Sequence, residues 1–324
     1  MSDSENWAFP PSLQPKPEDY AFELQAVLDA SVLLRVEVPD DAFTAQTLGT
    51  ERVGNGVVIR EDGLILTIGY LVTEAATIWI TTNKGTVVQG HPLAYDQATG
   101  FGLVMPLGKL GLAPIARGSV NSIAQGDDVL VIGQGGRPHA LTAKVADKRE
   151  FCGYWEYVLD EAVFTAPAHP QWGGAALVGD EGKLLGIGSL FVQEALDGKQ
   201  IEGNMIVPID LLDPILPDML KTGRAGGPAR PWLGLYAMEV DNRIAIGGLA
   251  HGGPAAKAGV KQGDLLLQIA GERVSKPTEL FRRLWLLGAA GIDVPLMLAR
   301  DGSIVNVTVK TGDRANYMKK PQLH

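Results

Sequence analysis

Short apolar runs separated by turn residues fill the first two thirds of the chain. The runs are rich in Val, Ile, Leu and Thr, and turn signals such as EDG, NKG, GDD and GDEG lie between them. This pattern is typical of the short strands of a β-sandwich or barrel. We therefore expect an all-β region whose strands include residues 31–38, 55–60, 64–69, 77–82, 128–133, 157–164 and 183–192. A short helix is expected over residues 19–30, where acidic and apolar residues alternate at helical spacing.

The pattern changes after Leu216. The segment 217–231 is rich in Gly, Pro, Lys and Arg, which is typical of an interdomain linker. Strands and one helix follow, and the helix is expected over residues 278–287, between Pro277 and Gly288. The chain is therefore expected to contain an arm (1–19), a first domain (20–216), a linker (217–229), a second domain (230–313) and a tail (314–324).

Composition supports this picture. The 324 residues include 40 Gly and 20 Pro, and a chain of this length is long enough for two or three domains with turn-rich β structure. Of the net charge of −9, residues 1–216 carry −15 and residues 217–324 carry +6. Nucleic-acid binding is not expected, because phosphate binding needs a basic face. A membrane span is not expected either, because no apolar run approaches 18 residues.

The first twenty residues, MSDSENWAFPPSLQPKPEDY, lack the basic and apolar regions of a signal peptide. We therefore expect a cytoplasmic location for the sequence as given, and a periplasmic one if a leader has been trimmed. The lone cysteine, Cys152, excludes an intrachain disulfide framework. Its thiol, in the aromatic segment EFCGYWEY, is either reactive or half-buried and inert, and we favour the second. No metal or other cofactor is expected, because no histidine pair has ligand spacing.

The segments PWLGLYAMEV and GGLAHGGPAAKAGVKQGDLLLQIAGERVSKPTEL, with a closing strand pair around RDG, resemble a PDZ domain of the HtrA (DegP) type. The resemblance covers residues 230–313. It implies a groove in which an extended peptide adds to a strand edge and backbone N–H groups capture its carboxylate. By position, the carboxylate loop and first groove strand are Trp232, Leu233, Gly234 and Leu235, and the helical wall of the pocket is Leu280, Leu284 and Leu287. The alternative is that these leucines are ordinary core residues.

The segments GNGVVIREDGLILTIGYLV, DQATGFGLV and HPQWGGAALVGDEGKLLGIGSL resemble the three triad segments of the HtrA-type, trypsin-like protease domain. The resemblance implies a double β-barrel, and it places Tyr70, Gly100 and Trp172 at the positions of the catalytic His, Asp and Ser. An indole cannot form an acyl-enzyme, and a phenol with a pKa near 10 is a poor base at neutral pH. The oxyanion-hole glycine is replaced by Pro170, which has no N–H to donate.

Two alternatives for the first domain stay open. In the first alternative, other side chains have taken over catalysis. The candidates are His91, His139, His169, Ser119, Ser122 and Ser189. Among them only His169, near the old nucleophile position, stands out, while Asp96 matches a non-catalytic family position. Trp172 is expected to fill the cleft, packing against Tyr70, and the alternative is a remodelled ligand pocket.

The leading hypothesis is therefore a non-enzymatic, bacterial pseudoprotease that acts as a peptide-binding scaffold or regulatory protein. Its expected partner is a protein C-terminus held in the PDZ groove. One competing hypothesis is an active HtrA-like endopeptidase with a relocated nucleophile, and another is an inactive subunit of an active HtrA-type protease. Assembly into a homotrimer or a homodimer is a further expectation, and Trp7 and Phe9 of the arm are the candidate residues for contacts between subunits.

Overall fold

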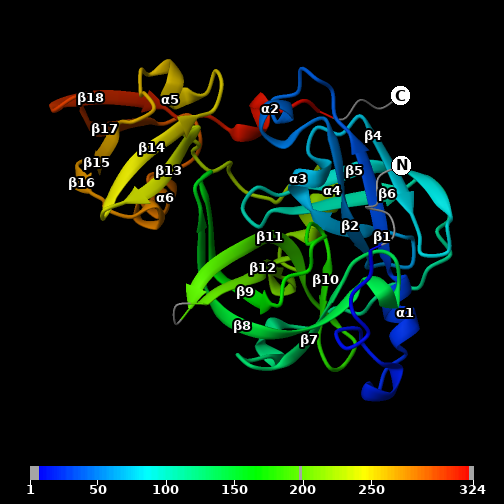
Figure 1. Cartoon of the computed structure of the whole chain (residues 1–324). Coiled ribbons are helices and arrows are strands. Elements are labelled where there is room, and N and C mark those ends of the chain that lie inside the picture. The colour runs from blue at the N-terminus through cyan, green and yellow to red at the C-terminus, as the bar shows by residue number, and fades with distance from the viewer. Residues whose placement is uncertain (1–6, 197–198, 321–324) are drawn as a thin grey trace. The chain divides into compact units, whose positions relative to one another are not determined.

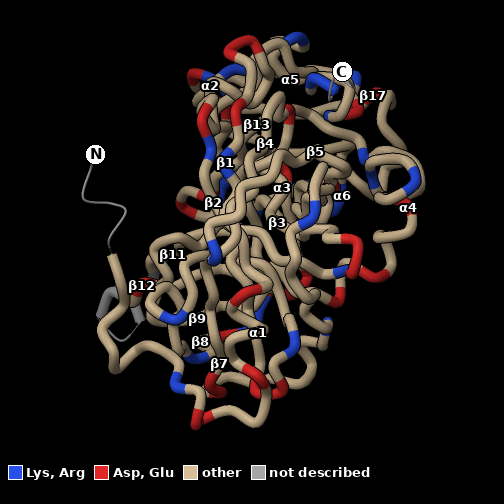
Figure 2. Tube along the Cα trace, turned by 90° about the vertical axis from the view of Figure 1, so that its right-hand side faces the viewer, with Lys and Arg blue, Asp and Glu red and all other residues tan. Residues whose placement is uncertain are grey.

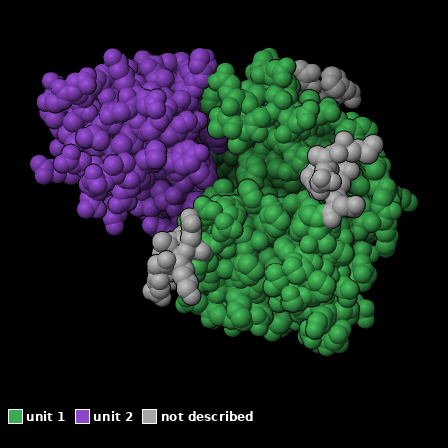
Figure 3. All heavy atoms as spheres, viewed as in Figure 1, with its two compact units in different colours: residues 1–149, 161–226, 320–324 green, residues 150–160, 227–319 purple. Residues whose placement is uncertain are grey.

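The structure is a computed structural model that describes residues 7–196 and 199–320. It consists of two compact units (Figure 3). Unit 1 contains the described residues up to 149 together with residues 161–226, and unit 2 contains residues 150–160 and 227–319. The expected first domain thus loses an internal segment, residues 150–160, to the second unit.

The first half of unit 1 is a closed antiparallel barrel (Figure 1). Val32, Leu34 and Val36 are buried and alternate with more exposed residues, because successive side chains of a strand point to opposite faces. The strands, in barrel order, are β1 (Ser31–Glu37), β2 (Glu51–Val58), β3 (Ile65–Ile68), β6 (Phe101–Pro106), β5 (Val87–Tyr95) and β4 (Thr77–Thr81).

A second closed barrel completes unit 1, which confirms the expected double barrel. The strands in barrel order are β10 (Ala176–Val178), β11 (Leu184–Leu196), β12 (Lys199–Pro208), β9 (Tyr157–Ala166), β8 (Ala140–Gly153) and β7 (Asp128–Ile132). Phe9 and Leu13 of the N-terminal arm pack against its core. The arm residue expected to contact another subunit, Phe9, is therefore used within its own chain.

Helices are short in unit 1. The expected helix over 19–30 is present as α1 (Leu24–Asp29), preceded by the 3₁₀ turn η2 (Pro17–Asp19). The remaining short helices and turns are α2 (Ala45–Leu48), α3 (Gly69–Val72), η3 (Val120–Ser122), η4 (Arg137–His139), η5 (Ile209–Leu211) and α4 (Leu216–Thr222).

Helix α4 corrects the expected linker. It occupies the first part of the Gly/Pro-rich segment, buries Met219, and ends at Gly223, whose φ of 78° is the left-handed conformation of a helix C-terminus. The carbonyl of Gly223 accepts a hydrogen bond from the N–H of Tyr95 at 3.1 Å. The connection to unit 2 is therefore shorter than its composition indicates.

Unit 2 is a twisted antiparallel sheet with two helices. Its strands, in sheet order, are β13 (Leu235–Val240), β14 (Arg243–Leu249), β15 (Leu265–Ile269), β17 (Asp293–Arg300) and β18 (Ser303–Lys310), and β16 (Glu272–Arg273) pairs with β15. The helices are α5 (Pro254–Lys257) and α6 (Pro277–Leu286), and the 3₁₀ turn η6 (Arg314–Tyr317) follows β18. The helix expected over 278–287 is thus confirmed within one residue.

Figure 2 shows several acidic segments near β7 and α1 of unit 1. Within the described ranges, no helix is both long and apolar enough to cross a membrane.

Candidate functional site

The loop of residues 232–235 presents three backbone N–H groups in one direction. Gly234 has φ 74°, a left-handed conformation that glycine adopts without steric cost. The carbonyls of Leu233 and Gly234 each accept a hydrogen bond of 2.8 Å from the backbone of a neighbouring alanine, which fixes the peptide planes. Successive N–H groups held in such a concavity form a binding site for an anion.

Trp232 anchors this loop. It exchanges two backbone hydrogen bonds of 3.0 Å with Gly312, and its indole packs edge-on against Tyr317 with ring centroids 4.8 Å apart. Because its N–H is used in this pairing, Trp232 positions the loop, and the three residues after it supply the donors.

A carboxylate occupies the loop. Glu156, from the turn between β8 and β9, receives hydrogen bonds at Oε1 from Gly234 at 2.6 Å and from Leu235 at 3.2 Å. The N–H of Leu233 is shared between Oε1 at 3.2 Å and Oε2 at 3.1 Å. The side chain is 5% exposed, so these donors replace the water that the carboxylate loses.

Burial is the dominant influence on Glu156, and it raises the pKa of the carboxyl group to about 7. The three N–H donors and the positive charge of Arg314 act in the opposite direction, because they favour the ionised form. The two influences leave a carboxyl group that ionises near neutral pH.

The main chain around Glu156 lies along β13, the strand at one end of the sheet order. Ala237 donates its N–H to the carbonyl of Tyr154 at 2.9 Å, and the ring of Tyr154 packs edge-on against Tyr236 at 5.7 Å. In Figure 1 the end of the green β8–β9 hairpin lies beside yellow β13. The hairpin therefore follows the strand edge where PDZ-type recognition adds a peptide.

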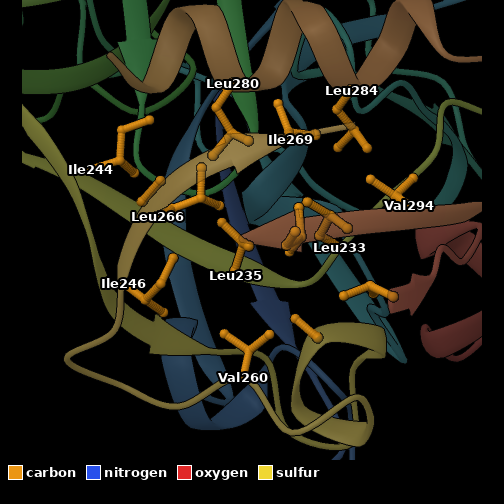
Figure 4. Packing of buried hydrophobic residues seen from close by; sticks show 14 of the residues in the cluster. Leu233, Leu235, Ile244, Ile246, Val260, Leu266, Ile269, Leu280, Leu284 and Val294 are labelled. Carbon is orange, nitrogen blue, oxygen red and sulfur yellow. The ribbon is translucent and has the colours of Figure 1, made fainter. Parts of the chain in front are cut away.

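The helix leucines lie on the inner side of α6. Leu280 and Leu284 are 0% exposed and point toward β15, the strand that carries Leu266 and Ile269 (Figure 4). Leu287, the third residue placed in the pocket wall, is half-buried and packs against the same cluster. These contacts are those of core residues, and a role in lining a ligand pocket stays a prediction.

Val158, from the β8–β9 hairpin, belongs to the same buried cluster as Leu280 and Leu284 and is 8% exposed. Sequence reasoning missed both Val158 and Glu156. The available signal was the acidic residue between Trp155 and Tyr157 in the segment EFCGYWEY, which we interpreted only as the surroundings of a cysteine.

Cys152 packs partly buried against this cluster. Burial, followed by the charge of Glu150, raises the pKa of the thiol to about 12. Since the thiolate is the nucleophilic form, the environment favours the inert interpretation.

In unit 1, the residue that we expected at the position of the family histidine is a half-buried phenol. Tyr70 lies on α3 and donates its hydroxyl hydrogen to the carbonyl of Ser189 at 2.9 Å. Burial raises the pKa of the phenol above its ordinary value, and a hydrogen bond with the Trp172 side chain only partly opposes this. The hydroxyl is therefore held in its protonated form at neutral pH.

Trp172, which we expected at the serine position, also packs against Phe191, with ring centroids 5.6 Å apart. Tyr70 and Trp172 are thus in contact, so the two residues that we expected at the base and nucleophile positions lie together. Whether the site retains a ligand pocket stays a prediction.

Gly100, which we expected at the aspartate position, has φ 81° and accepts a hydrogen bond from the N–H of Gly69 at 2.6 Å. The nearby Asp96 is buried and accepts two hydrogen bonds of 2.8 Å from the N–H and hydroxyl of Thr99. Asp96 therefore stabilises its own turn, as an Asx turn does.

The loop that carries Pro170 and Trp172 is fixed by Asn55 of β2. The Asn55 amide donates to the carbonyls of Gln171 at 2.8 Å and Gly173 at 3.2 Å. Gly174 has φ 76°, and a Cβ there would lie 1.8 Å from the backbone oxygen of Asn55. The loop backbone is thus rigidly packed against the first barrel.

His169 is fully buried, and both of its ring nitrogens are occupied. Nδ1 accepts a hydrogen bond from the N–H of Gln171 at 3.1 Å, so Nε2 is the protonated nitrogen and donates to the carbonyl of His139 at 2.9 Å. Trp7 and Phe9 cover the ring at centroid distances of 5.6 and 5.1 Å. Trp7, like Phe9, therefore makes its described contacts within unit 1.

Burial lowers the pKa of His169 to about 4. A general base works best with a pKa near the operating pH, so this histidine is poorly suited to such a role. The described hydrogen bonds of the candidate serines lie elsewhere: Ser119 donates to Asp210 and Ser122 donates to the carbonyl of Ser119. Across the described ranges, no three His, Cys, Asp or Glu side chains are grouped as metal ligands.

Comparisons with known proteins agree with this architecture. Residues 54–187 match the family of trypsin-like peptidase domains, and residues 231–311 match the PDZ domain family. The chain is 26% identical over 280 residues to a probable periplasmic serine endoprotease, DegP-like, from Halomonas elongata, covering 82% of this chain and 58% of that protein. It is 24% identical over 235 residues to the serine endoprotease DegS of Haemophilus influenzae, covering 68% and 66%. The chain thus spans less than two thirds of the length of either relative.

Solved structures share the fold. The HtrA-type protease AlgW with decapeptide superimposes with a TM-score of 0.53 at 19% identity, covering 92% of this chain and 99% of that chain. The serine endoprotease from Yersinia pestis gives a TM-score of 0.51 at 20% identity, covering 89% and 97%. The name of the Halomonas relative describes it as periplasmic, so the expected cytoplasmic location is not supported. The chain thus contains a trypsin-like peptidase domain followed by a PDZ domain, and it is similar to DegP-like serine endoproteases.

Proposed function

We propose that this chain binds the C-termini of partner proteins through the carboxylate loop of unit 2 and does not hydrolyse them. The observation that carries the proposal is the convergence of three backbone N–H groups, from Leu233, Gly234 and Leu235, on one carboxylate. A loop that holds a glutamate carboxylate in this way is chemically suited to the terminal carboxylate of a peptide.

The absence of hydrolysis is proposed from the residues at the triad positions. A serine-type mechanism needs an activated nucleophile, a base in contact with it and a group that orients the base. Tyr70, Gly100 and Trp172 supply none of these functions, and Pro170 offers no N–H to an oxyanion.

Peptide binding is tested with fluorescein-labelled decapeptides that end in Val, Leu, Phe or Trp, each with a free or an amidated C-terminus. We expect anisotropy titrations to show binding of the free acids and a loss of at least about tenfold in affinity on amidation, because hydrogen bonds to a charged carboxylate are stronger than those to a neutral amide.

The matched variants are Gly234→Ala and Gly252→Ala. Both glycines have positive φ, at 74° and 61°, but only Gly234 lies in the carboxylate loop, and a Cβ on Gly252 would meet nothing within 4 Å. Gly234→Ala should therefore weaken binding while Gly252→Ala should not. Equal binding of acid and amide would contradict the proposal.

A second candidate function is endopeptidase activity through a relocated nucleophile, which the names of the relatives favour. A labelled-casein digestion distinguishes the two, with His169→Gln as the informative variant. Turnover that disappears in this variant would support the endopeptidase. A third candidate, an inactive subunit of an active HtrA-type protease, is tested by co-purification from the native source, where self-assembly alone would count against it.

The periplasmic location of the DegP-like relatives is the location we propose for this chain as well. Cell fractionation with an epitope-tagged chain tests it, and recovery with cytoplasmic markers would refute it.

A further inference from the structure

We propose that the tip of the β8–β9 hairpin, residues 150–160, is an internal ligand of the peptide groove, so that an external C-terminus binds only after the tip has left. The inference rests on the proposed function and adds its regulation. It follows from three parts of the groove that the tip already fills: the carboxylate loop, the strand edge and the apolar pocket.

The first part is the carboxylate loop. A backbone N–H group has one hydrogen to donate, and those of Leu233, Gly234 and Leu235 are all directed to Glu156. A peptide carboxylate entering the same loop would find its donors in use and would face a like charge in a buried site. Glu156 and a peptide C-terminus therefore exclude each other.

The second part is the edge of β13. The carbonyl of Tyr154 accepts from Ala237, while the side chain of Glu156, two residues later, reaches Leu233–Leu235 at the beginning of the strand. The tip thus runs antiparallel to β13, with its carboxylate at the carboxylate loop. This is the orientation of a C-terminal peptide added to a strand edge, except that the chain turns back after Glu156.

The third part is apolar. Val158 is 8% exposed and lies in one cluster with Leu235, Leu280 and Leu284, and Cys152 packs on the same cluster. An apolar side chain from the hairpin is therefore buried against the helix leucines that we expected to wall the pocket for a peptide side chain. All three elements of recognition, the charge, the main chain and the apolar side chain, come from the chain itself.

The ion pairs that hold the tip are weak. Its outer attachment consists of ion pairs of Arg282 with Glu150 at 2.8 Å and with Asp160 at 2.5 Å. These side chains are between 44% and 86% exposed, so water and salt weaken the pairs. Glu156 itself has φ 61°, a left-handed conformation that is costly for a residue other than glycine. The docked tip therefore carries backbone strain that its release would remove.

The expected consequence is a groove with reduced apparent affinity. The apparent dissociation constant equals the intrinsic one divided by the fraction of molecules with the tip released. If about one molecule in a hundred has released its tip, an external peptide binds about 100-fold more weakly than it would to an open groove. A protein partner that also competes for the exposed tip residues would open the groove.

The first experiment compares Glu156→Gln with the intact chain, using the labelled decapeptides described above. The variant keeps the size of the side chain but removes its charge, so we expect peptide affinity to rise about 10- to 100-fold, the effect of losing hydrogen bonds to a charged group. The matched control is Glu161→Gln in the same hairpin. Glu161 is 47% exposed and pairs with Lys148, away from the loop, so this variant should bind peptide as the unmodified chain does.

The second experiment uses the unmodified chain, so it does not depend on the folding of a variant. Hydrogen–deuterium exchange is measured over residues 150–160 with and without a saturating decapeptide. Release of the tip should raise exchange there by at least about tenfold, while exchange in β17, in the same unit, should stay unchanged.

The outcomes separate the regulation from the function. Equal affinities for the unmodified chain and Glu156→Gln, or a tip that stays protected in the peptide complex, would overturn the internal ligand and leave C-terminal binding intact. If neither form binds any free-acid peptide, C-terminal binding itself fails and the internal ligand fails with it. Tighter binding by Glu156→Gln, lost on amidation of the peptide, is the result that we expect.

Discussion

Lowering the pH from 7 to 5 should destabilise the second barrel through one buried side chain, His169. In the folded chain burial holds the pKa of its imidazole near 4, whereas an unfolded histidine has a pKa of 6.5. Between these values the unfolded state binds a proton that the folded state does not. Stability is therefore complete above about pH 6.5, falls as the pH decreases, and levels off below about pH 4.

The magnitude follows from the two pKa values. At pH 5 the folded imidazole is mostly neutral while the unfolded one is almost fully protonated, which corresponds to a loss of about 2 kcal/mol relative to pH 7. Protonation of the folded imidazole at Nδ1 would also break the hydrogen bond from the N–H of Gln171, because a protonated nitrogen cannot accept one, whereas Nε2 could still donate to the carbonyl of His139.

Two measurements check this. An NMR titration of the His169 Cε1 resonance should show no protonation above pH 5. Urea titrations should show that the free energy of unfolding falls between pH 7 and pH 5. This fall should be smaller by about 2 kcal/mol in His169→Gln but not in His251→Gln, whose side chain is exposed. If His169 titrates between pH 6 and 7, or if both variants keep the full loss, burial does not set its pKa, and its use as a base would need to be reconsidered.

Three further changes test the site and the packing. Trp172→Ser should produce no turnover in a labelled-casein assay, because the Tyr70 phenol stays protonated at neutral pH, and measurable turnover would contradict this. Gly174→Ala should lower the melting temperature much more than Gly111→Ala, since both have positive φ but only Gly174 would place its Cβ 1.8 Å from a backbone oxygen, and equal shifts would refute the contact. Leu284→Ala should reduce the unfolding free energy of unit 2 by about 2–5 kcal/mol in urea titrations, as cavities in a core do, and a loss below about 1 kcal/mol would show that the side chain is not tightly packed.

The strands were predictable because their signals are local. Residues 31–38 and 77–82, for example, become β1 (Ser31–Glu37) and β4 (Thr77–Thr81), where alternation and turn residues fix both face and length. Helix α4 was missed because the glycines and prolines after Thr222 dominate the composition of the window, although the helix itself ends before Gly223. The composition of a window therefore hides the end of α4, which the backbone conformation places at a single residue.

The carboxylate loop was predictable from its sequence, but its occupant was not. Glu156 lies 77 residues before Leu233, and no periodicity or capping pattern links such distant positions. Only the antiparallel approach of the hairpin to β13 brings them together. Sequence reasoning therefore predicted a loop that binds a peptide carboxylate, which stays a prediction, and could not show that the chain places a carboxylate of its own there.

The division of unit 2 into two stretches of chain has a consequence for biosynthesis. Residues 150–160 leave the ribosome well before residues 227–319, so the hairpin tip is made before the groove that holds it. During that interval Val158 and Glu156 have no partner in unit 2, and the unit reaches its complete form only after β18 has been synthesised. A fragment cut at the family boundaries, residues 231–311, would therefore be a different molecule from the domain in the chain: it would have an empty carboxylate loop and an uncovered apolar surface where Val158 lies.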